Sequence, residues 1–270
     1  MSETITKDRF YFDPEFVGSP DGRTIRIMSE YYGPLRRLRR KKVADTIVFF
    51  GSARIKSRAD AKKALVNAGK NGNAKSLNRL KKDLEMAQYY EDARTLAGQF
   101  TKWSKGLKGT KRRYIICSGG GPGIMEASNR GAREAGGISV GLTISLPEEQ
   151  SGNPWITDDL DLKFHYFFMR KFWFLYLAKA LVVWPGGFGT LDELMELLTL
   201  IQTKKIKKRV PIVLYGKEFW ENVVNWDYLV EIGTISNDDL ELFHISDSKK
   251  DTFNYVTSFI EKHHLKGPNF

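Results

Sequence analysis

Short apolar runs alternate with amphipathic segments along most of the chain, and this alternation predicts the fold class. The apolar runs have the length expected of strands that are buried on both faces of a sheet. The segments between them have helical periodicity. The sequence therefore predicts an α/β fold, a Rossmann-like doubly wound parallel sheet with helices on both faces. The predicted strands are Thr46–Phe50, Tyr114–Cys117, Ser139–Ile144, Ala180–Trp184 and Arg209–Tyr215.

The predicted helices lie between these strands and after the last of them. The most apolar one, Phe164–Ala178, has 15 residues and carries Arg170 and Lys171 near its centre. Crossing a bilayer takes about 20 apolar residues, so we expect a buried helix and no membrane partner. A loop is expected from Ser145 to Asp159. The remaining helical segments are residues 60–103, with a polar turn in the middle, 124–135, 191–203, 219–230 and 251–264.

The first 44 residues differ from the rest of the chain because they are polar and end in the basic run Arg36–Lys42. They predict a helical or irregular N-terminal extension, with a turn at Ser19–Gly22, ahead of a single domain over residues 45–270. Residues 1–8 lack the apolar stretch of a secretory signal. The single cysteine, Cys117, excludes an internal disulfide, so a reducing, cytoplasmic location is expected.

The formal net charge of +11 is compatible with a nucleic-acid surface, an anionic substrate or a merely solvated exterior. The basic runs lie between apolar segments and contain no interleaved aromatic residues for stacking bases. Solvated faces are therefore favoured, and nucleic acid is not an expected partner. No group of Cys and His residues has the spacing of a zinc site, so neither a metal nor another cofactor is predicted.

Three of the predicted strands end in turns of small residues, at Gly51–Arg54, Ser118–Gly123 and Pro185–Thr190. In an open parallel sheet the carboxyl ends of the strands line the ligand crevice, so these turns are expected to face one another. Glycine lets backbone N–H groups close around an anion, and the following helix N-terminus adds partial positive charge. The pattern favours a phosphate site, although glycine can also serve only to permit a tight turn.

Two common nucleotide motifs are missing from these turns. No Gly-Lys-Ser/Thr follows either glycine-rich turn, which excludes a P-loop. The segment Gly119–Ile124 lacks the third glycine of the dinucleotide-binding pattern. ATP hydrolysis and hydride transfer therefore lose support.

Three charged residues near the turns each allow two interpretations. Glu193 follows Thr190 at the spacing of a helix capping box, and it is also a candidate catalytic carboxylate. Glu126 lies in the first turns of a helix, where a carboxylate is favourable, and it could instead hold ribose hydroxyls. Arg170 has almost no polar neighbours on its helix, so its guanidinium needs either a protein carboxylate or an anionic ligand.

In order and spacing, three segments resemble the LOG ("Lonely Guy") family of nucleoside 5′-monophosphate phosphoribohydrolases, members of which were long labelled possible lysine decarboxylases. The segments are Ser118–Glu126, Met169–Lys171 and Pro185–Glu193, and the similarity covers about residues 45–220. The N-terminal extension and the tail resemble the longer bacterial type. Short members carry a histidine where this chain has Phe168, which bears on base preference. Nothing in the sequence supplies the Schiff-base lysine and partners that a decarboxylase would need.

The resemblance implies hydrolysis of the N-glycosidic bond of a purine nucleoside 5′-monophosphate, AMP or the N6-substituted AMP of cytokinin-activating members. It also implies at least a homodimer. The essential arginine and glutamate of the family map onto Arg170 and Glu193. The turns and the resemblance together predict these substrate-binding residues: Gly51, Ser52, Ser118, Gly119, Gly120, Gly121, Glu126, Met169, Lys171, Pro185, Gly186, Gly187, Gly189 and Thr190.

Two other functions stay open on the sequence. The unexplained N-terminal segment and the net charge of +11 are compatible with a non-catalytic nucleotide-binding or sensing module on the same fold. A nucleic-acid-processing protein is a third and weaker interpretation, and salt-insensitive or absent DNA binding would count against it. Turnover of a nucleotide, or its absence, separates the first two.

Overall fold

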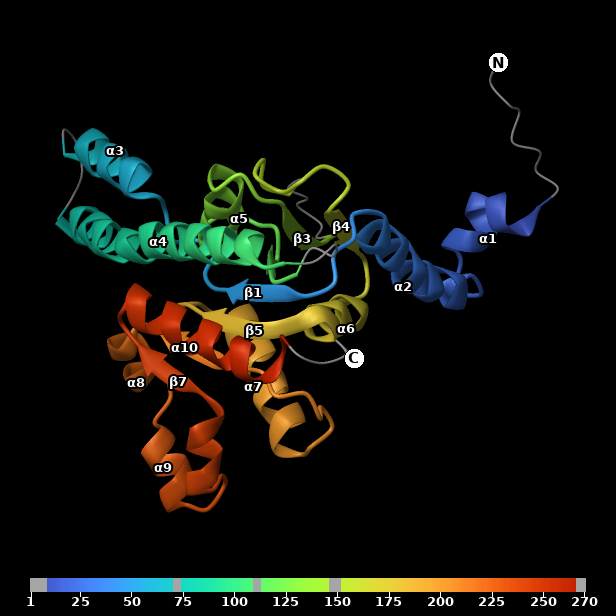
Figure 1. Cartoon of the computed structure of the whole chain (residues 1–270). Coiled ribbons are helices and arrows are strands. Elements are labelled where there is room, and N and C mark those ends of the chain that lie inside the picture. Colours follow the sequence, from blue (N-terminus) through green and yellow to red (C-terminus); the bar gives the residue numbers. More distant parts are fainter. Residues whose placement is uncertain (1–8, 70–73, 109–112, 146–151, 266–270) are drawn as a thin grey trace.

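Seven parallel strands form one sheet in the order β4-β3-β2-β1-β5-β6-β7. The computed structural model describes residues 9–69, 74–108, 113–145 and 152–265 (Figure 1). From the central strand β1, the chain builds the sheet outward through β2, β3 and β4 and then returns to build the other half. The predicted fold class is confirmed. The strands are β1 Thr46–Phe50, β2 Ile115–Ser118, β3 Ser139–Ile144, β4 Asp161–Phe164, β5 Ala178–Val183, β6 Ile212–Tyr215 and β7 His244–Ser246.

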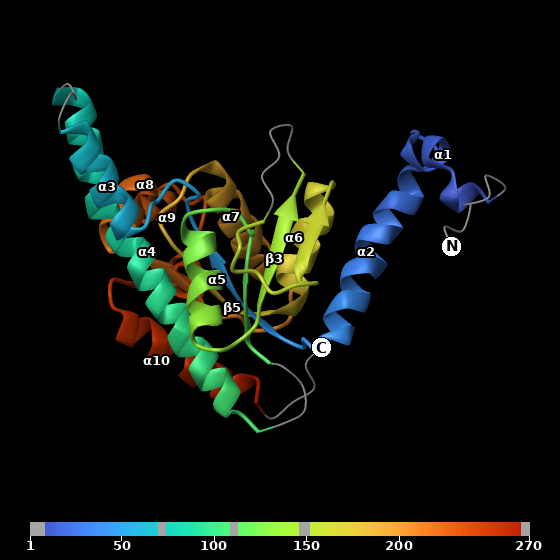
Figure 2. The same ribbon diagram turned by 90° about the horizontal axis from the view of Figure 1, so that it is seen from above.

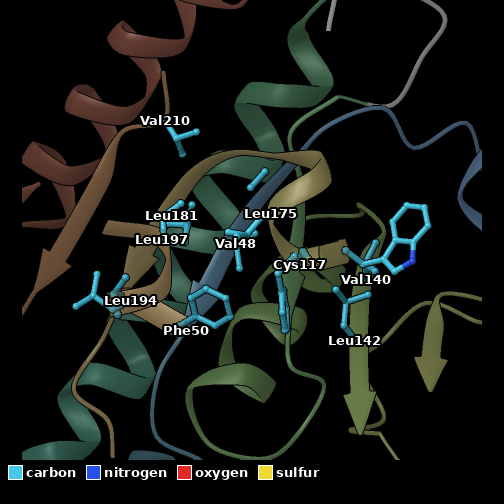
Figure 3. Close-up of a cluster of buried hydrophobic side chains, with 14 of the residues drawn as sticks. Val48, Phe50, Cys117, Val140, Leu142, Leu175, Leu181, Leu194, Leu197 and Val210 are labelled. Atoms are coloured by element: carbon cyan, nitrogen blue, oxygen red, sulfur yellow. The ribbon is translucent and has the colours of Figure 1, made fainter. Parts of the chain in front are cut away.

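Helices cover both faces of the sheet because neighbouring residues of the central strand point to opposite sides. Ile47 and Phe49 pack into one apolar cluster with α4, α5 and α10. Val48 and Phe50 pack into the other with α6 and α7, and Figure 3 shows these two side chains among Leu175, Leu194 and Leu197. The helices named here are α4 Ala74–Gly106, α5 Ile124–Glu134, α6 Phe167–Leu177, α7 Phe188–Gln202 and α10 Lys249–His263.

The remaining helices extend the body of the molecule. In Figure 2 the helix α3 lies along α4. The N-terminal extension is helical, and its long helix α2 lies beside α6 at the edge of the molecule (Figure 2). Ser19–Gly22 connects α1 to α2 as a turn. These elements are α1 Pro14–Gly18, α2 Arg23–Arg40, α3 Arg58–Ala68, α8 Lys217–Val223, α9 Trp226–Glu231 and the 3-10 turns Phe10–Phe12 and Asn237–Leu242.

The structure corrects the predicted elements in two places. The predicted helix Phe164–Ala178 is too long at both ends, because Phe164 ends β4 and Ala178 begins β5. The two edge strands β4 and β7 were not predicted. β4 alternates exposed and buried residues and β7 has 3 residues, so neither presents the continuous apolar run that marks the central strands.

Two other predictions fall wholly or partly on residues outside the described ranges. They concern residues 1–8, where a secretory signal was not expected, and residues 146–151 of the predicted loop. Among the described helices, none combines the length and apolarity needed to cross a bilayer.

Candidate active site

The three small-residue turns meet at the carboxyl edge of the sheet, beside the neighbouring strands β1 and β5 where the strand order reverses. Such a reversal is where open α/β sheets bind their ligands. Backbone hydrogen bonds join the turns, since the Ser52 amide donates to the Pro185 carbonyl at 3.0 Å and Ile124 donates to Ser52 at 3.1 Å. A cavity of about 770 Å³ opens here, and ten predicted site residues line it: Gly51, Ser52, Gly119, Arg170, Pro185, Gly186, Gly187, Gly189, Thr190 and Glu193.

The turn after β5 presents the uncapped beginning of a helix to this cavity. Helix α7 begins at Phe188, its N-cap is Gly187, and no side chain caps this end. Its first backbone N–H groups therefore lack side-chain partners, and they form the positive end of the helix dipole. Thr190 is the third residue inside the helix, so the capping-box interpretation of Thr190 and Glu193 is wrong. An anion is the natural ligand of such an end.

The Glu193 carboxyl lies on α7 at the cavity wall and is 7% exposed. Burial raises the pKa of Glu193 to about 7, against the opposing effect of the nearby Arg170 and Lys171 charges. Within the described part of the chain, no hydrogen bond or ion pair engages this carboxyl. A buried carboxyl without a structural partner, with a pKa near neutrality, is the usual signature of a catalytic acid, base or charge stabiliser.

Arg170 reaches the same cavity from α6. Its Nε donates to the Leu142 carbonyl at 2.7 Å, and its guanidinium lies 5.1 Å from the centre of the Phe174 ring. Burial lowers the pKa of Arg170, while the Glu193 charge acts in the opposite direction. No carboxylate of the described residues lies within ion-pair distance of it. The structural pairing considered for Arg170 is thus not observed, and its remaining N–H donors are available to an anionic ligand.

The turn after β2 is held by a buried polar network, which explains why some of its predicted site residues do not line the cavity. The Ser118 hydroxyl donates to Asn129 Oδ1 at 2.7 Å and accepts the Gly120 amide at 3.1 Å. The Asn153 amide nitrogen lies 3.1 Å from the Gly120 carbonyl and 3.0 Å from that of Gly121. These groups fix the turn, and Gly119 is its predicted glycine that borders the cavity.

Three other predicted site residues also lie outside the cavity wall. Glu126 accepts a hydrogen bond from the Tyr90 hydroxyl at 2.7 Å. Lys171 does not reach solvent as a free cation, because its Nζ lies 2.8 Å from both Asp192 and Glu196 of α7. Met169 is a buried residue of α6. Lys171 therefore ties α6, which carries Arg170, to α7, which carries Glu193.

The structure adds wall residues that sequence reasoning missed. Arg54 follows Ser52 in a turn that the sequence did single out, so its position was available as a signal. Some of the others lie in or beside the quoted motif segments, the rest come from segments that no motif marks, and several are apolar enough to contact a flat ring. They are Phe50, Ala53, Arg54, Ile55, Arg79, Asp83, Met86, Met125, Phe167, Phe188, Leu191, Asp192 and Phe219. Over the described ranges, no group of three or more His, Cys, Asp or Glu side chains is placed to hold a metal ion.

Comparison with known proteins agrees with the motifs. The model of the family described as "Possible lysine decarboxylase" matches residues 125–256. A "Pyrimidine/purine nucleotide 5'-monophosphate nucleosidase" of Escherichia coli (strain K12) is 31% identical over 117 residues, and its counterpart in Escherichia coli O157:H7 matches equally. The alignment covers 39% of this chain and 25% of the relative, so the chain spans about a quarter of the length of these curated relatives.

Two solved structures are similar to this chain at lower sequence identity. The X-ray structure of TM1055, a structural genomics target, has 20% sequence identity and a TM-score of 0.48, over 81% of this chain and 99% of that one. The Moco carrier protein from Chlamydomonas reinhardtii has 18% identity and a TM-score of 0.45, over 81% and 98% of the two chains.

Proposed function

Because the chain carries the LOG-family motifs and matches the family model described as "Possible lysine decarboxylase", we propose that it hydrolyses the N-glycosidic bond of nucleoside 5′-monophosphates. The observation that carries this proposal is the buried Glu193 carboxyl, which shares one cavity with the Arg170 guanidinium and the uncapped start of α7. The named activity of the E. coli relatives, nucleotide 5′-monophosphate nucleosidase, supports the same reaction.

The geometry assigns a separate task to each part of the cavity. The 5′-phosphate binds the amides at the start of α7, where the helix dipole favours negative charge. Glu193 lies five residues after Phe188, about 7.5 Å along the helix axis at 1.5 Å per residue, so the same helix can contact both ends of a ribose 5-phosphate. Binding of the phosphate supplies energy remote from the bond that breaks. A free nucleoside is therefore expected to be a poor substrate.

The chemical step breaks the C1′–N bond and forms a bond from C1′ to a water oxygen. Positive charge builds on the ribose as the base departs, and the Glu193 carboxylate stabilises that charge and orients the water. The proton lost by the water balances the negative charge on the departing base. Arg170 stays protonated throughout, because its pKa stays far above neutrality, and it orients the substrate and stabilises negative charge. The products are free base and ribose 5-phosphate.

For the base, we propose a purine, with AMP or N6-substituted AMP as substrate. The apolar side chains of Met125, Phe167 and Phe219 at the cavity wall support a flat aromatic ring as the remaining part of the ligand. A panel of nucleoside monophosphates, including AMP and N6-isopentenyl-AMP, tests this choice by chromatography of the released base. Greater release from pyrimidine nucleotides would overturn the purine preference and leave the reaction type standing.

Replacing the carboxyl tests the proposal most directly. Glu193→Gln keeps the size of the side chain and removes its charge, so we expect kcat/KM with AMP to fall about 10³-fold, as for loss of a principal charge-stabilising group. Glu231→Gln, at an exposed glutamate that ends α9, is the matched control and should retain activity within about threefold. Full activity of Glu193→Gln, or no base release by the natural chain from any nucleotide, contradicts the proposal. Tight nucleotide binding without turnover would instead indicate a sensing module.

The pH dependence follows from the raised pKa of Glu193. Catalysis needs the ionised form, so kcat/KM should rise about tenfold per pH unit below pH 7 and level off above it. The charges that face this carboxyl are Arg170 and Lys171 from α6 and Asp192 and Glu196 from α7. A flat profile between pH 5 and pH 8 would contradict this role.

The contribution of Glu193 to the free energy of unfolding should fall with rising pH, in the direction opposite to kcat/KM. A carboxyl whose pKa is raised by folding favours the folded state while protonated, and that advantage is lost as the pH rises through about 7. Glu193→Gln should therefore be more stable than the natural chain at pH 8, by on the order of 2–3 kcal/mol, and equally stable at pH 4. Urea denaturation at the two pH values measures the difference.

The oligomeric state belongs to the same proposal. Helix α6 exposes a row of aromatic side chains, and their exposure supports the homodimer that the family resemblance implies. Gel filtration with light scattering tests it, and a monomer at micromolar concentration would overturn it. The exposed rings are Phe167, Phe168, Phe172 and Tyr176.

A further inference from the structure

The N-terminal helix α2 contacts the start and the middle of the helix that carries Arg170. Both carboxylate oxygens of Glu30 accept backbone N–H groups at the start of α6, from His165 at 2.7 Å and from Tyr166 at 3.2 Å. Tyr166 is the N-cap of α6, and its own side chain does not cap the helix. A carboxylate at this end satisfies orphan donors and interacts favourably with the helix dipole. Glu30 therefore fixes the two residues that lead into α6, His165 and the N-cap Tyr166, from another element.

A second contact anchors α6 two turns further on. The indole N–H of Trp173 donates to the backbone carbonyl of Glu30 at 2.9 Å, and the Tyr31 ring packs on the Trp173 ring at 5.7 Å. Arg170 lies between the two anchors, four residues after Tyr166 and three before Trp173. Its own backbone N–H donates to the Tyr166 carbonyl at 3.2 Å. The segment of helix that carries the guanidinium is thus fixed on both sides by contacts with α2.

The carboxyl end of α2 holds the strand that leads into α6. Arg37 donates to the Asp161 carbonyl at 3.2 Å, and Arg40 forms an ion pair with Asp159 at 2.8 Å. Asp161 begins β4, and two residues separate the end of β4 from α6. Arg26 adds a hydrogen bond to the Tyr166 hydroxyl at 3.2 Å. Contacts along α2 therefore reach β4, the start of α6 and its middle, whereas α2 contributes no residue to the cavity wall.

We infer that α2 belongs to the catalytic apparatus, and that Glu30 is a positioning residue which fixes α6 and so places the Arg170 guanidinium in the cavity. This inference rests on the proposed function, and it assigns a task to the N-terminal extension. Glu30 does not touch the substrate. It acts through the backbone of His165 and Tyr166, and a displacement of about 1 Å at a substrate-orienting group is enough to slow catalysis as much as 10²-fold.

Four variants test this role: Glu30→Ala, Glu30→Gln, Trp173→Phe and, as the matched control, Glu15→Ala. Glu15 is an exposed glutamate in α1, and the contacts of the described residues do not involve its carboxylate. With AMP as substrate, Glu30→Ala should lower kcat by about 10-fold to 100-fold with a smaller change in KM. Glu30→Gln keeps an acceptor oxygen and should recover much of that loss. Trp173→Phe keeps a ring without the donor and should lower kcat less than Glu30→Ala.

Two further readouts separate positioning from a general loss of stability. The Arg170 charge lowers the pKa of Glu193, so a displaced Arg170 should move the rising limb of kcat/KM in Glu30→Ala to higher pH. A variant that is merely less stable keeps the limb in place. Hydrogen–deuterium exchange should show faster exchange of the α6 amides in Glu30→Ala than in Glu15→Ala, and this measurement needs no activity.

The outcomes distinguish the two proposals. If the natural chain releases no base from any nucleotide, the proposed function fails and the catalytic part of this inference fails with it. If the natural chain is active, and Glu30→Ala has unchanged kcat, pH limb and α6 exchange, the inference alone is overturned. A loss in Glu30→Ala that Glu30→Gln does not relieve at all also overturns it, because glutamine keeps the oxygen that accepts from one of the two N–H groups.

Discussion

The turn after β2 and the turn after β5 both bring glycines to the cavity, but protein atoms crowd the glycines of the first turn and leave space around Gly187 and Gly189 of the second, where Gly186 alone packs against Thr190. A Cβ at Gly119 would lie 2.5 Å from the Arg170 guanidinium, and one at Gly120 would lie 2.4 Å from Thr143. Around Gly187 and Gly189 no atom lies within 4 Å of such a Cβ. The two turns thus use the missing side chain for different purposes.

In the first turn, the protein itself occupies the space that a side chain would fill. The network of Ser118, Asn129 and Asn153 holds the backbone, and the guanidinium of Arg170 passes over Gly119. In the second turn, the open space lies beside the uncapped start of α7. A ligand can approach that backbone, which is what a phosphate-binding turn requires. The first turn therefore supports the site, and the second is the surface that we assign to the substrate.

Among the changes that test the difference between the two turns, Gly119→Ala is expected to have the largest effect. The new methyl group would displace Arg170, because the guanidinium stands at 2.5 Å from its position, and kcat/KM with AMP should fall about 10²-fold. Gly33→Ala is the control, since nothing lies within 4 Å of a Cβ there and its helix α2 tolerates alanine. Steady-state kinetics with both variants measures the difference. Unchanged activity of Gly119→Ala would show that Arg170 needs no fixed position.

The next effect concerns stability. Asn153→Ala removes the side-chain donor to the carbonyls of Gly120 and Gly121. The backbone N–H of residue 153 still donates to Gly120 at 2.8 Å, but the Gly121 carbonyl loses this donor, so the free energy of unfolding should fall by about 1–2 kcal/mol. Asn222→Ala, the control, removes an exposed amide that contacts the Glu218 carbonyl. It should change the free energy of unfolding by less than about 0.5 kcal/mol. Urea denaturation compares the two variants. Equal stabilities would mean that the network does not hold the first turn.

The smallest effect is expected from Gly187→Ala, which tests whether the open space beside the second turn holds the phosphate. Gly187 has φ of −94° and ψ of −153°, extended values that alanine can adopt, so Gly187→Ala should leave the melting temperature unchanged. Its methyl group would occupy space that we assign to the phosphate, and the Kd for ribose 5-phosphate should rise about tenfold, or 1.4 kcal/mol. Titration calorimetry checks this. An unchanged Kd for ribose 5-phosphate would mean that the phosphate binds elsewhere.

Much of the central fold could be predicted from the sequence, and the edges could not. The strands β1, β3 and β5 are buried on both faces, and their continuous apolar runs mark them. β4 alternates exposed and buried residues in the pattern of a half-solvated edge, and β7 is short. Edge strands owe their existence to pairing with a neighbour that is already in place, and a local pattern carries little trace of that pairing.

The candidate site divides in the same way. The motifs identified Arg170, Glu193 and the glycines of the second turn, and the cavity contains them all. The contacts of Ser118 and Glu126 with substrate stay predictions, and the structure adds protein partners that the motifs did not indicate, Asn129 for Ser118 and Tyr90 for Glu126. These partners lie 11 and 36 residues away along the chain. A motif describes neighbours in sequence, whereas a hydrogen-bond partner is a neighbour in space.

The sequence by itself determined the parallel α/β architecture, the three turns at one edge of the sheet and the two charged residues between them, because strand burial and glycine turns are written in local patterns. Only the tertiary structure decided what each group faces. It buried the Glu193 carboxyl without a partner among the described residues, fixed the residues before α6 through Glu30 of a distant helix, and placed Asn153 behind the first turn. Burial and partners arise when remote segments pack together, and those contacts set the pKa of Glu193 and the position of Arg170.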